Sequence, residues 1–420
     1  MCTISGTCDS IEAMEKVVLM AGKMKGVGSV NGDGLTAPDP AREGFETRAV
    51  HEGQGYAGET GAVIPPVYLT STFASGNADG FDYTRSGNPN FRNLQETLAS
   101  LEGAKHATVF GSGVAAITAV VSTLKSGDLV LAEENVYGCT YRLFAQVFEK
   151  FGVRVVYRDF TDEAALVAVR EEKPALVWIE SPTNPLLKIV DIAAVSEVAR
   201  KVGSVVLVDN TFASSYLQRP VELGAHLSLL STTKYTSGHS DVLGGAVCTD
   251  EDEWQEKMIF AQKALGLQPS PFDSWMVSRG AKTQAVRMER HCANALALAE
   301  WLEHEGGAKW VRYPYLESHP QYDLAKKQMR GGSGIIAVDL GLSLEETERF
   351  LGALRLFVKA ESLGGIESLS CHPATMTHAS VPRETREAVG ITDGLVRLSV
   401  GIETVEDLIG DVARALGEAN

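Results

Sequence analysis

A lysine flanked by hydroxyl side chains is the residue of this sequence best suited to covalent chemistry. Lys234 stands in the run Ser231-Thr232-Thr233-Lys234-Tyr235, directly after the apolar stretch LSLL and before SGHSDVLGG. A lysine amine can form an imine with an aldehyde cofactor, and neighbouring hydroxyl groups can hold a phosphate. A lysine after a strand is more often a solvated loop residue, so this interpretation depends on what else the sequence supplies.

An acidic residue ends a second apolar run upstream, where VVLV leads into Asp209. A carboxylate at the end of a buried strand needs a cationic partner, because an unpaired buried charge is unfavourable. A protonated pyridine nitrogen is such a cation, and a protonated ring withdraws electrons from a carbanion at the substrate Cα. Without Lys234, a helix cap or loop aspartate would be the preferred interpretation.

A short glycine-rich turn, Phe110-Gly111-Ser112-Gly113-Val114, follows the run ATVF and precedes the helical stretch AAITAVVSTL. Backbone amides and the helix dipole at such a turn favour a phosphate group. The turn lacks the GxGxxG spacing of dinucleotide-binding folds, so it gains meaning only together with the lysine and the aspartate. The three features together predict a site for a phosphorylated aldehyde cofactor.

These residues follow strands in a regular alternation of short apolar runs and helical stretches. The apolar runs are ATVF, DLVLAE, VRVVYR, ALVWIE, VVLVDN and LSLLS, and EAALVAVREE and IAAVSEVARKV are examples of the helical stretches between them. This alternation predicts an α/β fold with a mostly parallel sheet, whose ligands bind at the carboxyl ends of the strands.

The length of 420 residues predicts two domains. After residue 280 a long helical segment is followed by GIIAVDLG, LFVKAESLG and LVRLSVG, which indicates a smaller α+β domain. The predicted organisation is a flexible N-terminal tail (1–43), an arm (44–84), a large cofactor-binding domain (85–280) and a small C-terminal domain (281–420).

Charge and composition favour a small-molecule ligand. The net charge of −16 argues against nucleic acid or an anionic membrane as a partner, and no apolar run is long enough to span a bilayer. The six cysteines form no CxxC pair and no zinc spacing, which predicts a reducing, cytoplasmic location and no metal site.

From about residue 44 to the C-terminus, several motifs resemble those of one enzyme family. They are YTRSGNP (83–89), ESPTNP (180–185), VLVDNTF (206–212), STTKYTSGHSDVLGG (231–245), ESLGGIESL (361–369) and GLVRLSVGIE (394–403). The sequence resembles the Cys/Met-metabolism family of fold-type-I pyridoxal-phosphate (PLP) enzymes, which includes cystathionine γ-lyase, cystathionine γ-synthase and methionine γ-lyase. The resemblance implies an aminotransferase-like fold with a large PLP domain and a smaller α+β domain.

The resemblance also implies residue roles at the cofactor. Lys234 becomes the Schiff-base lysine, Asp209 the partner of the ring nitrogen, and Tyr137 a residue that stacks on the ring and takes part in catalysis. The remaining implied cofactor contacts are Asn184 at the ring and Gly113, Val114, Ser231 and Thr233 at the phosphate.

In this family two further residues reach the phosphate from the neighbouring subunit, and they correspond to Tyr83 and Arg85. This implies a homodimer joined through the arm at 44–84, and usually a tetramer made of two dimers. An arginine suits this role, because its guanidinium fork matches phosphate oxygens.

The implied substrate contacts centre on Arg397, which clamps the carboxylate with help from Asn184 and Ser362. Arg85 and Tyr137 also belong to the implied substrate site. The alternatives are an outward arginine on a half-buried strand, a turn asparagine between two prolines and an ordinary core tyrosine.

The substrate itself depends on few positions. Glu361 and Arg142 correspond to residues that meet the distal amino and carboxylate groups of cystathionine, where opposite charges help to hold it. The segment LGLQPSPFDSWMVSRGAKT resembles the lyase branch. We therefore expect α,γ-elimination of L-cystathionine to L-cysteine, 2-oxobutyrate and ammonia.

Three alternatives stay open. The first is a methionine γ-lyase, because Cys139 stands where those enzymes carry a characteristic cysteine. A γ-replacement of O-acyl-homoserine with cysteine, as in cystathionine γ-synthase, uses the same cofactor chemistry. A non-catalytic homo-oligomer that binds PLP is the third.

Overall fold

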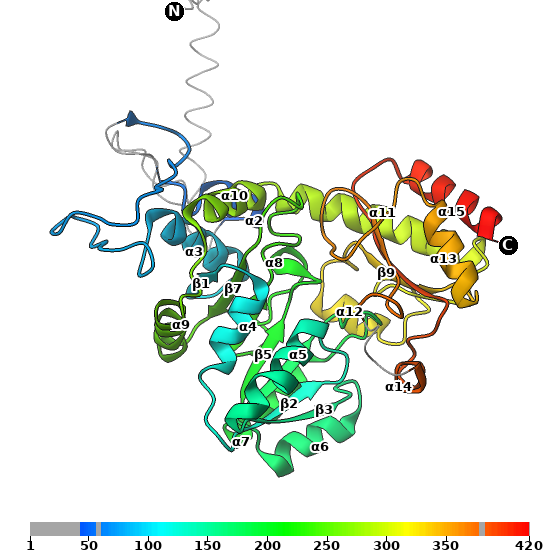
Figure 1. Cartoon of the computed structure of the whole chain (residues 1–420), viewed down its shortest axis with the longest axis horizontal. Helices are drawn as coiled ribbons and strands as arrows, with labels where there is room; N and C mark the ends of the chain where they lie inside the picture. Colours follow the sequence, from blue (N-terminus) through cyan, green and yellow to red (C-terminus); the bar gives the residue numbers. More distant parts are fainter. Residues whose placement is uncertain (1–42, 56–59, 378–382, 420) are drawn as a thin grey trace, which may run out of the picture. The chain divides into compact units, whose positions relative to one another are not determined.

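The computed structural model describes residues 43–55, 60–377 and 383–419, and all of these belong to one compact unit. The predicted tail at 1–43 lies outside the described residues except for its last position. Two sheets organise the described chain, one between residues 106 and 249 and the other between residues 310 and 399 (Figure 1). The predicted domain boundary near residue 280 falls just before α11, the helix that begins the second part.

The larger sheet has seven strands in the order β1-β7-β6-β5-β4-β2-β3. β7 is antiparallel to both of its neighbours, and the other pairs are parallel. The six apolar runs of the sequence correspond to β1 to β6, whereas β7 was not predicted. The strands are β1 (His106–Phe110), β2 (Leu129–Glu133), β3 (Arg154–Arg158), β4 (Leu176–Glu180), β5 (Val205–Asp209), β6 (Leu227–Leu230) and β7 (Gly245–Thr249).

The central strands of this sheet are buried on both faces, which explains why they read as continuous apolar runs. In β4, Leu176 and Trp178 pack into one core with α4, while Val177 and Ile179 pack into another with α6 and α7. The helices of this part are α2 (Phe45–His51), α3 (Pro89–Glu102), α4 (Gly113–Val121), α5 (Gly138–Gln146), α6 (Glu163–Glu172), α7 (Ile192–Val202), α8 (Ser214–Leu217), α9 (Asp252–Leu265) and α10 (Pro271–Ala281), with a 3₁₀ turn at Phe148–Phe151.

The smaller sheet has five strands in the order β10-β11-β12-β9-β8, antiparallel except for the β10–β11 pair. Its strands are β8 (Trp310–Arg312), β9 (Ile335–Asp339), β10 (Val358–Lys359), β11 (Leu369–Cys371) and β12 (Leu395–Ser399). Its helices are α11 (Gln284–His304), α12 (Tyr322–Gln328), α13 (Leu344–Ala353), α14 (Arg383–Ala388) and α15 (Val405–Ala419). α11, α13 and α15 share one apolar core with β9 and β12 (Figure 1).

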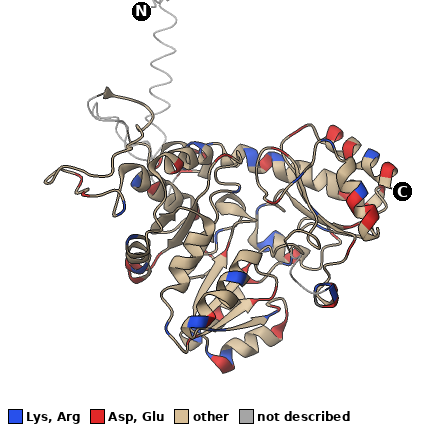
Figure 2. Cartoon of the chain, viewed as in Figure 1, with Lys and Arg blue, Asp and Glu red and all other residues tan. Residues whose placement is uncertain are grey.

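Charged side chains of both signs are spread over the helices of the described chain (Figure 2). Acidic residues gather on α13 and α15, each of which has two in its first turn, where negative charge is favourable beside the helix dipole. None of the helices in the described ranges has the length and apolar content of a bilayer-spanning segment.

Candidate active site

A cavity of about 370 Å³ lies at the carboxyl ends of β4, β5 and β6. Its lining combines residues from the part of the chain that forms the larger sheet with residues from the part that forms the smaller sheet. The structure brings together in this cavity most of the residues predicted from the sequence: Gly113, Val114, Tyr137, Asn184, Asp209, Ser231, Thr233, Lys234, Glu361, Ser362 and Arg397. The predicted residues Tyr83, Arg85 and Arg142 are not part of its lining.

Lys234 lies in the turn that follows β6 and is partly buried. Its Nζ donates a hydrogen bond to Ser362 Oγ at 2.6 Å. Burial, and then the positive charge of Arg397, lower the pKa of Lys234 to about 8. A substantial fraction of this amine is therefore neutral near physiological pH, as a nucleophile or a base requires.

Asp209 ends β5 and is only 9% exposed. Its Oδ1 accepts a hydrogen bond from the Thr211 backbone N–H at 3.0 Å, and burial raises the pKa of the carboxyl group. No cationic side chain contributes to the pKa of Asp209. The Asp209 carboxylate could therefore pair with a cationic group of a ligand.

The start of α4 lies so close to Ser231 that glycine is favoured there. α4 begins at Gly113, and the Ser112 side chain caps it by accepting a hydrogen bond from Ala115 N at 3.0 Å. A Cβ atom at Gly113 would lie 3.0 Å from Ser231 Cβ and Oγ. The free amides of the first turn thus approach Ser231 closely, which suits a phosphate group.

The two predicted phosphate hydroxyls differ in their surroundings. Ser231 Oγ makes no hydrogen bond within the described part of the chain, although its backbone N–H donates to Thr211 Oγ1 at 2.9 Å. The Thr233 hydroxyl already bonds the backbone of Gly244, as donor to the carbonyl at 3.2 Å and as acceptor from the N–H at 2.9 Å. Ser231 is therefore the better placed of the two for a ligand.

Tyr137 precedes α5 and is 40% exposed at the cavity, so it is not an ordinary core tyrosine. Partial burial, and then a hydrogen bond with Cys139, raise the pKa of its phenol, which keeps the hydroxyl protonated. Cys139 Sγ in turn accepts a hydrogen bond from Arg142 Nη2 at 2.8 Å. Arg142 is exposed and is linked to Tyr137 through this contact with Cys139.

Arg397 lies in β12 and is only 3% exposed, which overturns the alternative of an outward residue on a half-buried strand. Its Nη1 donates to Asn184 Oδ1 at 2.9 Å, and its Nη2 donates to the Ser362 carbonyl at 3.0 Å. Its Nε is buried and has no hydrogen-bond partner among the residues that the structure describes. A guanidinium bonded only to neutral oxygens retains its capacity for an anionic ligand.

The arm residues lie away from this cavity. Tyr83 is 43% exposed, and Arg85 Nη1 donates to the Lys263 carbonyl at 3.1 Å. The Arg85 guanidinium also stands 5.5 Å from the centre of the Tyr83 ring. Glu361, in contrast, is exposed but does line the cavity.

Several lining residues were not predicted from the sequence, among them Glu180, Thr211, Phe212 and Thr377. Glu180 had an available signal, because it ends the apolar run VWI in the same way that Asp209 ends VVLV. Thr377 had none, because it belongs to an irregular segment after β11.

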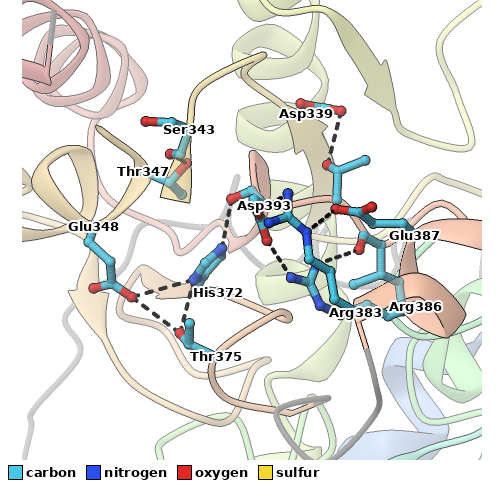
Figure 3. A network of polar contacts seen from close by, with 12 residues as sticks. Asp339, Ser343, Thr347, Glu348, His372, Thr375, Arg383, Arg386, Glu387 and Asp393 are labelled. Carbon is cyan, nitrogen blue, oxygen red and sulfur yellow. Dashed lines mark hydrogen bonds and ion pairs between the residues drawn. The ribbon is translucent and has the colours of Figure 1, made fainter. Parts of the chain in front are cut away.

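A polar network anchors that segment (Figure 3). The His372 ring, fully buried, contacts Thr375 Oγ1 at 2.9 Å, the Asp393 carbonyl at 2.9 Å and Glu348 Oε1 at 3.4 Å. Arg386 forms an ion pair with the Asp393 carboxylate. The network ties the start of the segment to α13 and to the residues just before β12.

The residues of the cavity fit PLP. They offer an amine of lowered pKa, a carboxylate that lacks a protein cation, a glycine-lined helix start beside an unbonded hydroxyl, and a tyrosine. Residues 46–417 match the family described as Cys/Met metabolism PLP-dependent enzyme. The chain belongs to this family. It is therefore a PLP-dependent enzyme, and its cofactor prediction is confirmed.

Relatives in this Cys/Met-metabolism family are similar over nearly their whole length. The chain is 46% identical to cystathionine β-lyase of Coxiella burnetii, covering 91% of this chain and 100% of the relative. It is 45% identical to cystathionine γ-lyase of Bos taurus, covering 91% and 95% respectively. A β-lyase was not among the alternatives drawn from the sequence.

Solved structures of the family confirm the predicted fold class. A cystathionine γ-synthase from Xanthomonas oryzae pv. oryzae, in complex with cystathionine, has a TM-score of 0.87 and 42% identity, covering 90% of this chain and 98% of that one. A cystathionine γ-lyase from Micromonospora echinospora has a TM-score of 0.86 and 42% identity, covering 89% and 99%.

Proposed function

We propose that the protein catalyses the α,γ-elimination of L-cystathionine, with water, to L-cysteine, 2-oxobutyrate and ammonia. The observation that carries the proposal is the meeting of the Lys234 amine, the Asp209 carboxylate and the Arg397 guanidinium in one cavity. Curated γ-lyases at 44 to 45% identity support the choice of reaction.

When bound at Lys234, PLP supplies an electron sink that acidifies the protons on the substrate Cα and Cβ. The Lys234 amine removes the Cα proton and then carries a proton from Cβ, so that the electron pair left at Cβ can expel the γ-substituent. The raised pKa of Tyr137 keeps its phenol protonated, and we assign it the donation of a proton to the departing sulfur.

The substrate is held at both ends in this proposal. Arg397, with Asn184 and Ser362, binds the α-carboxylate. Glu361 at the cavity lining faces the distal ammonium group, and Arg142 at the rim faces the distal carboxylate. A plain thiomethyl group would leave both of these charged residues without a ligand partner, which favours cystathionine over methionine.

The active unit in this proposal is a homodimer, assembled further into a tetramer of two dimers in the cytoplasm. Tyr83 and Arg85 complete the phosphate site of the neighbouring subunit. Apolar side chains on the arm support an interface there, because Val63 is 69% exposed and Leu69 is 73% exposed in the single chain. The ligand is a small amino acid, with no nucleic-acid partner.

A β-elimination is the second candidate, favoured by the similarity to a cystathionine β-lyase. The two reactions break opposite carbon–sulfur bonds of the same substrate. The γ-lyase reaction releases cysteine and 2-oxobutyrate, whereas the β-lyase reaction releases homocysteine and pyruvate.

Incubation of the purified protein with L-cystathionine, followed by identification of the products by mass, tests the proposal. We expect cysteine and 2-oxobutyrate, and neither from the Lys234→Ala variant. Pyruvate and homocysteine alone would establish the β-lyase. Parallel incubations with methionine, and with O-succinyl- or O-acetylhomoserine plus cysteine, test the methionine lyase and the synthase. Absence of product from every substrate would leave the non-catalytic PLP-binding protein.

A further inference from the structure

Three acidic side chains stand side by side at the carboxyl edge of the large sheet. Glu133, Glu180 and Asp209 are the last residues of β2, β4 and β5, which are neighbours in the sheet. Glu180 and Asp209 are direct partners in the parallel register, so their side chains point to the same side. All three are buried, with exposed fractions of 0%, 4% and 9%.

Glu180 is held by a backbone group and not by a cation. Its Oε1 accepts a hydrogen bond from the Tyr137 backbone N–H at 2.6 Å. That bond joins the end of β4 to the residue that precedes α5. Within the described ranges no ion pair of Glu180 is formed, and Lys188, a cation near this edge, is paired with Glu134 and Asp159.

Ionisation of both members of a pair of adjacent buried carboxyl groups is unfavourable, because each negative charge is poorly solvated and repels the other. Burial, followed by the negative charge of Asp209 and a smaller effect of Glu133, raises the pKa of Glu180 well above its usual value. Burial also raises the pKa of Glu133, to about 7. Asp209 lines the same cavity as Lys234 and is the residue assigned to the nitrogen of the cofactor ring, so it is the member of the pair that can gain a cationic partner.

We propose that Glu180 is a positioning residue that acts as a neutral carboxylic acid. Its carbonyl oxygen holds the backbone of Tyr137 at the start of α5, while Asp209 alone carries the negative charge that meets the ring nitrogen. The second part rests on the proposed role of Asp209. A charged Glu180 would compete with Asp209 for the same cationic group. Removal of the Glu180 side chain would leave the Tyr137 backbone N–H without this acceptor.

The protonation state is tested on the holoenzyme without an activity assay. Thermal unfolding is measured from pH 5 to pH 8 for the wild type, for Glu180→Gln and for the control Glu171→Gln, which makes the same change at an exposed site on α6. An acid whose pKa is raised by folding stabilises the protein at low pH and loses that contribution as pH rises. As the pH rises, the melting temperature of Glu180→Gln should therefore increase relative to that of the wild type by about 2 °C per pH unit. The difference in melting temperature between the control and the wild type should not change with pH.

A spectroscopic measurement makes the same distinction. The infrared spectrum of the wild type at pH 7 should contain the carbonyl stretch of a protonated carboxylic acid that is absent from Glu180→Gln. The proposal would be overturned if the melting temperatures of the wild type and Glu180→Gln changed equally with pH and the wild-type spectrum contained no carbonyl band that Glu180→Gln lacks.

The positioning role is tested by the affinity for PLP. Glu180→Ala removes the acceptor for the Tyr137 N–H, and we expect the dissociation constant for PLP to rise about tenfold, whereas Glu180→Gln keeps an acceptor and should stay within about twofold. An equal loss of PLP affinity in Glu180→Ala and Glu180→Gln would show that the charge of Glu180 is needed, and would refute the proposal that Glu180 is a neutral acid. If Asp209→Asn bound PLP as tightly as the wild type, the proposed placement of the cofactor beside Asp209 would be wrong. This result is distinct from a failure of the proposal for Glu180.

Discussion

The floor and the rim of the active site differ sharply in exposure. On the floor, Asp209, Glu180 and Arg397 are each more than nine-tenths buried, and the partly buried Lys234 amine donates a hydrogen bond to Ser362 Oγ. On the rim, Glu361 and Arg142 are exposed, and Arg142 donates a hydrogen bond to Cys139. Tyr83 of the arm and the adjacent Arg85 are exposed and are not part of the cavity lining of their own chain.

This difference separates the chemistry of the enzyme from its specificity. Strand ends and the packed core determine the floor, to which the proposed function assigns the amine, the carboxylate and the anion clamp. The rim supplies the charges that would meet the distal end of a substrate, and the arm is suited to a neighbouring subunit. We therefore expect floor substitutions to abolish every reaction and rim substitutions to change the choice of substrate.

Substitution of Lys234 should have the largest effect. The Lys234→Ala variant loses both the covalent attachment point and the proton carrier, so turnover should fall by at least about a thousandfold. Product formation is measured for all substrates that the wild type accepts, with Lys201→Ala, at an exposed lysine on α7, as the control. A variant that kept turnover of any one substrate would remove the distinction between floor and rim.

Substitution of Arg85 should also impair turnover strongly, although the residue lies outside its own cavity. Loss of a charge-assisted phosphate contact should lower turnover by about tenfold to a hundredfold, because such bonds are among the strongest. Arg154→Ala, at an exposed arginine of β3, is the control.

Mixed subunits make the arm prediction decisive. When inactive Lys234→Ala chains and weakly active Arg85→Ala chains are unfolded, mixed and refolded together, half of the dimers contain one chain of each kind, and one of their two sites is intact. Activity should return to about a quarter of the wild-type value. If the mixture stayed as inactive as its components, the arm would not complete the site of a partner.

The pH dependence of cofactor uptake tests the burial of the floor lysine. Only the neutral amine attacks an aldehyde, and the pKa of Lys234 is about 8. The rate at which the apoenzyme takes up PLP should rise about tenfold per pH unit below pH 8 and level off above it. Stopped-flow absorbance gives the midpoint, and a midpoint near the pKa of a solvated lysine would contradict the desolvated environment.

Substitution of Glu361 should have the smallest effect, because an exposed charge pair contributes little. In Glu361→Ala we expect KM for cystathionine to rise about threefold to fivefold with kcat nearly unchanged. The binding of methionine, measured as an inhibition constant, should not change. Equal effects on both ligands would assign Glu361 to the general architecture and not to the distal ammonium group.

The sequence pattern pointed to two floor residues, Asp209 and Lys234, because they stand at or just after the ends of apolar runs, whereas Arg397 was named only from the family resemblance. Asp209 and Lys234 both follow strands that are buried on both faces, and the carboxyl ends of neighbouring parallel strands must meet. The same logic applied to VWIE would have found Glu180, which was overlooked because no cofactor atom had been assigned to it. β7 was overlooked because its residues, Gly245–Thr249, are too mixed to form a distinct apolar run.

Other features could not be read from local patterns. Thr377 reaches the cavity through an irregular segment held by His372, whose contacts join residues far apart in the sequence. The engagement of the Thr233 hydroxyl by Gly244 depends on a turn closed across eleven residues. The choice between γ-elimination and β-elimination depends on how substrate lies against the rim, where few contacts within one chain fix the side chains.

The most direct test of the account is chemical mapping of the lysine that holds the cofactor. Holoenzyme is reduced with borohydride and digested, and the modified peptide is sequenced by mass spectrometry. We predict a stable pyridoxyl-phosphate adduct on Lys234 in the wild type and no such adduct in Lys234→Ala. An adduct on any other lysine of the wild type, or none at all, would contradict the placement of the cofactor between this amine and Asp209.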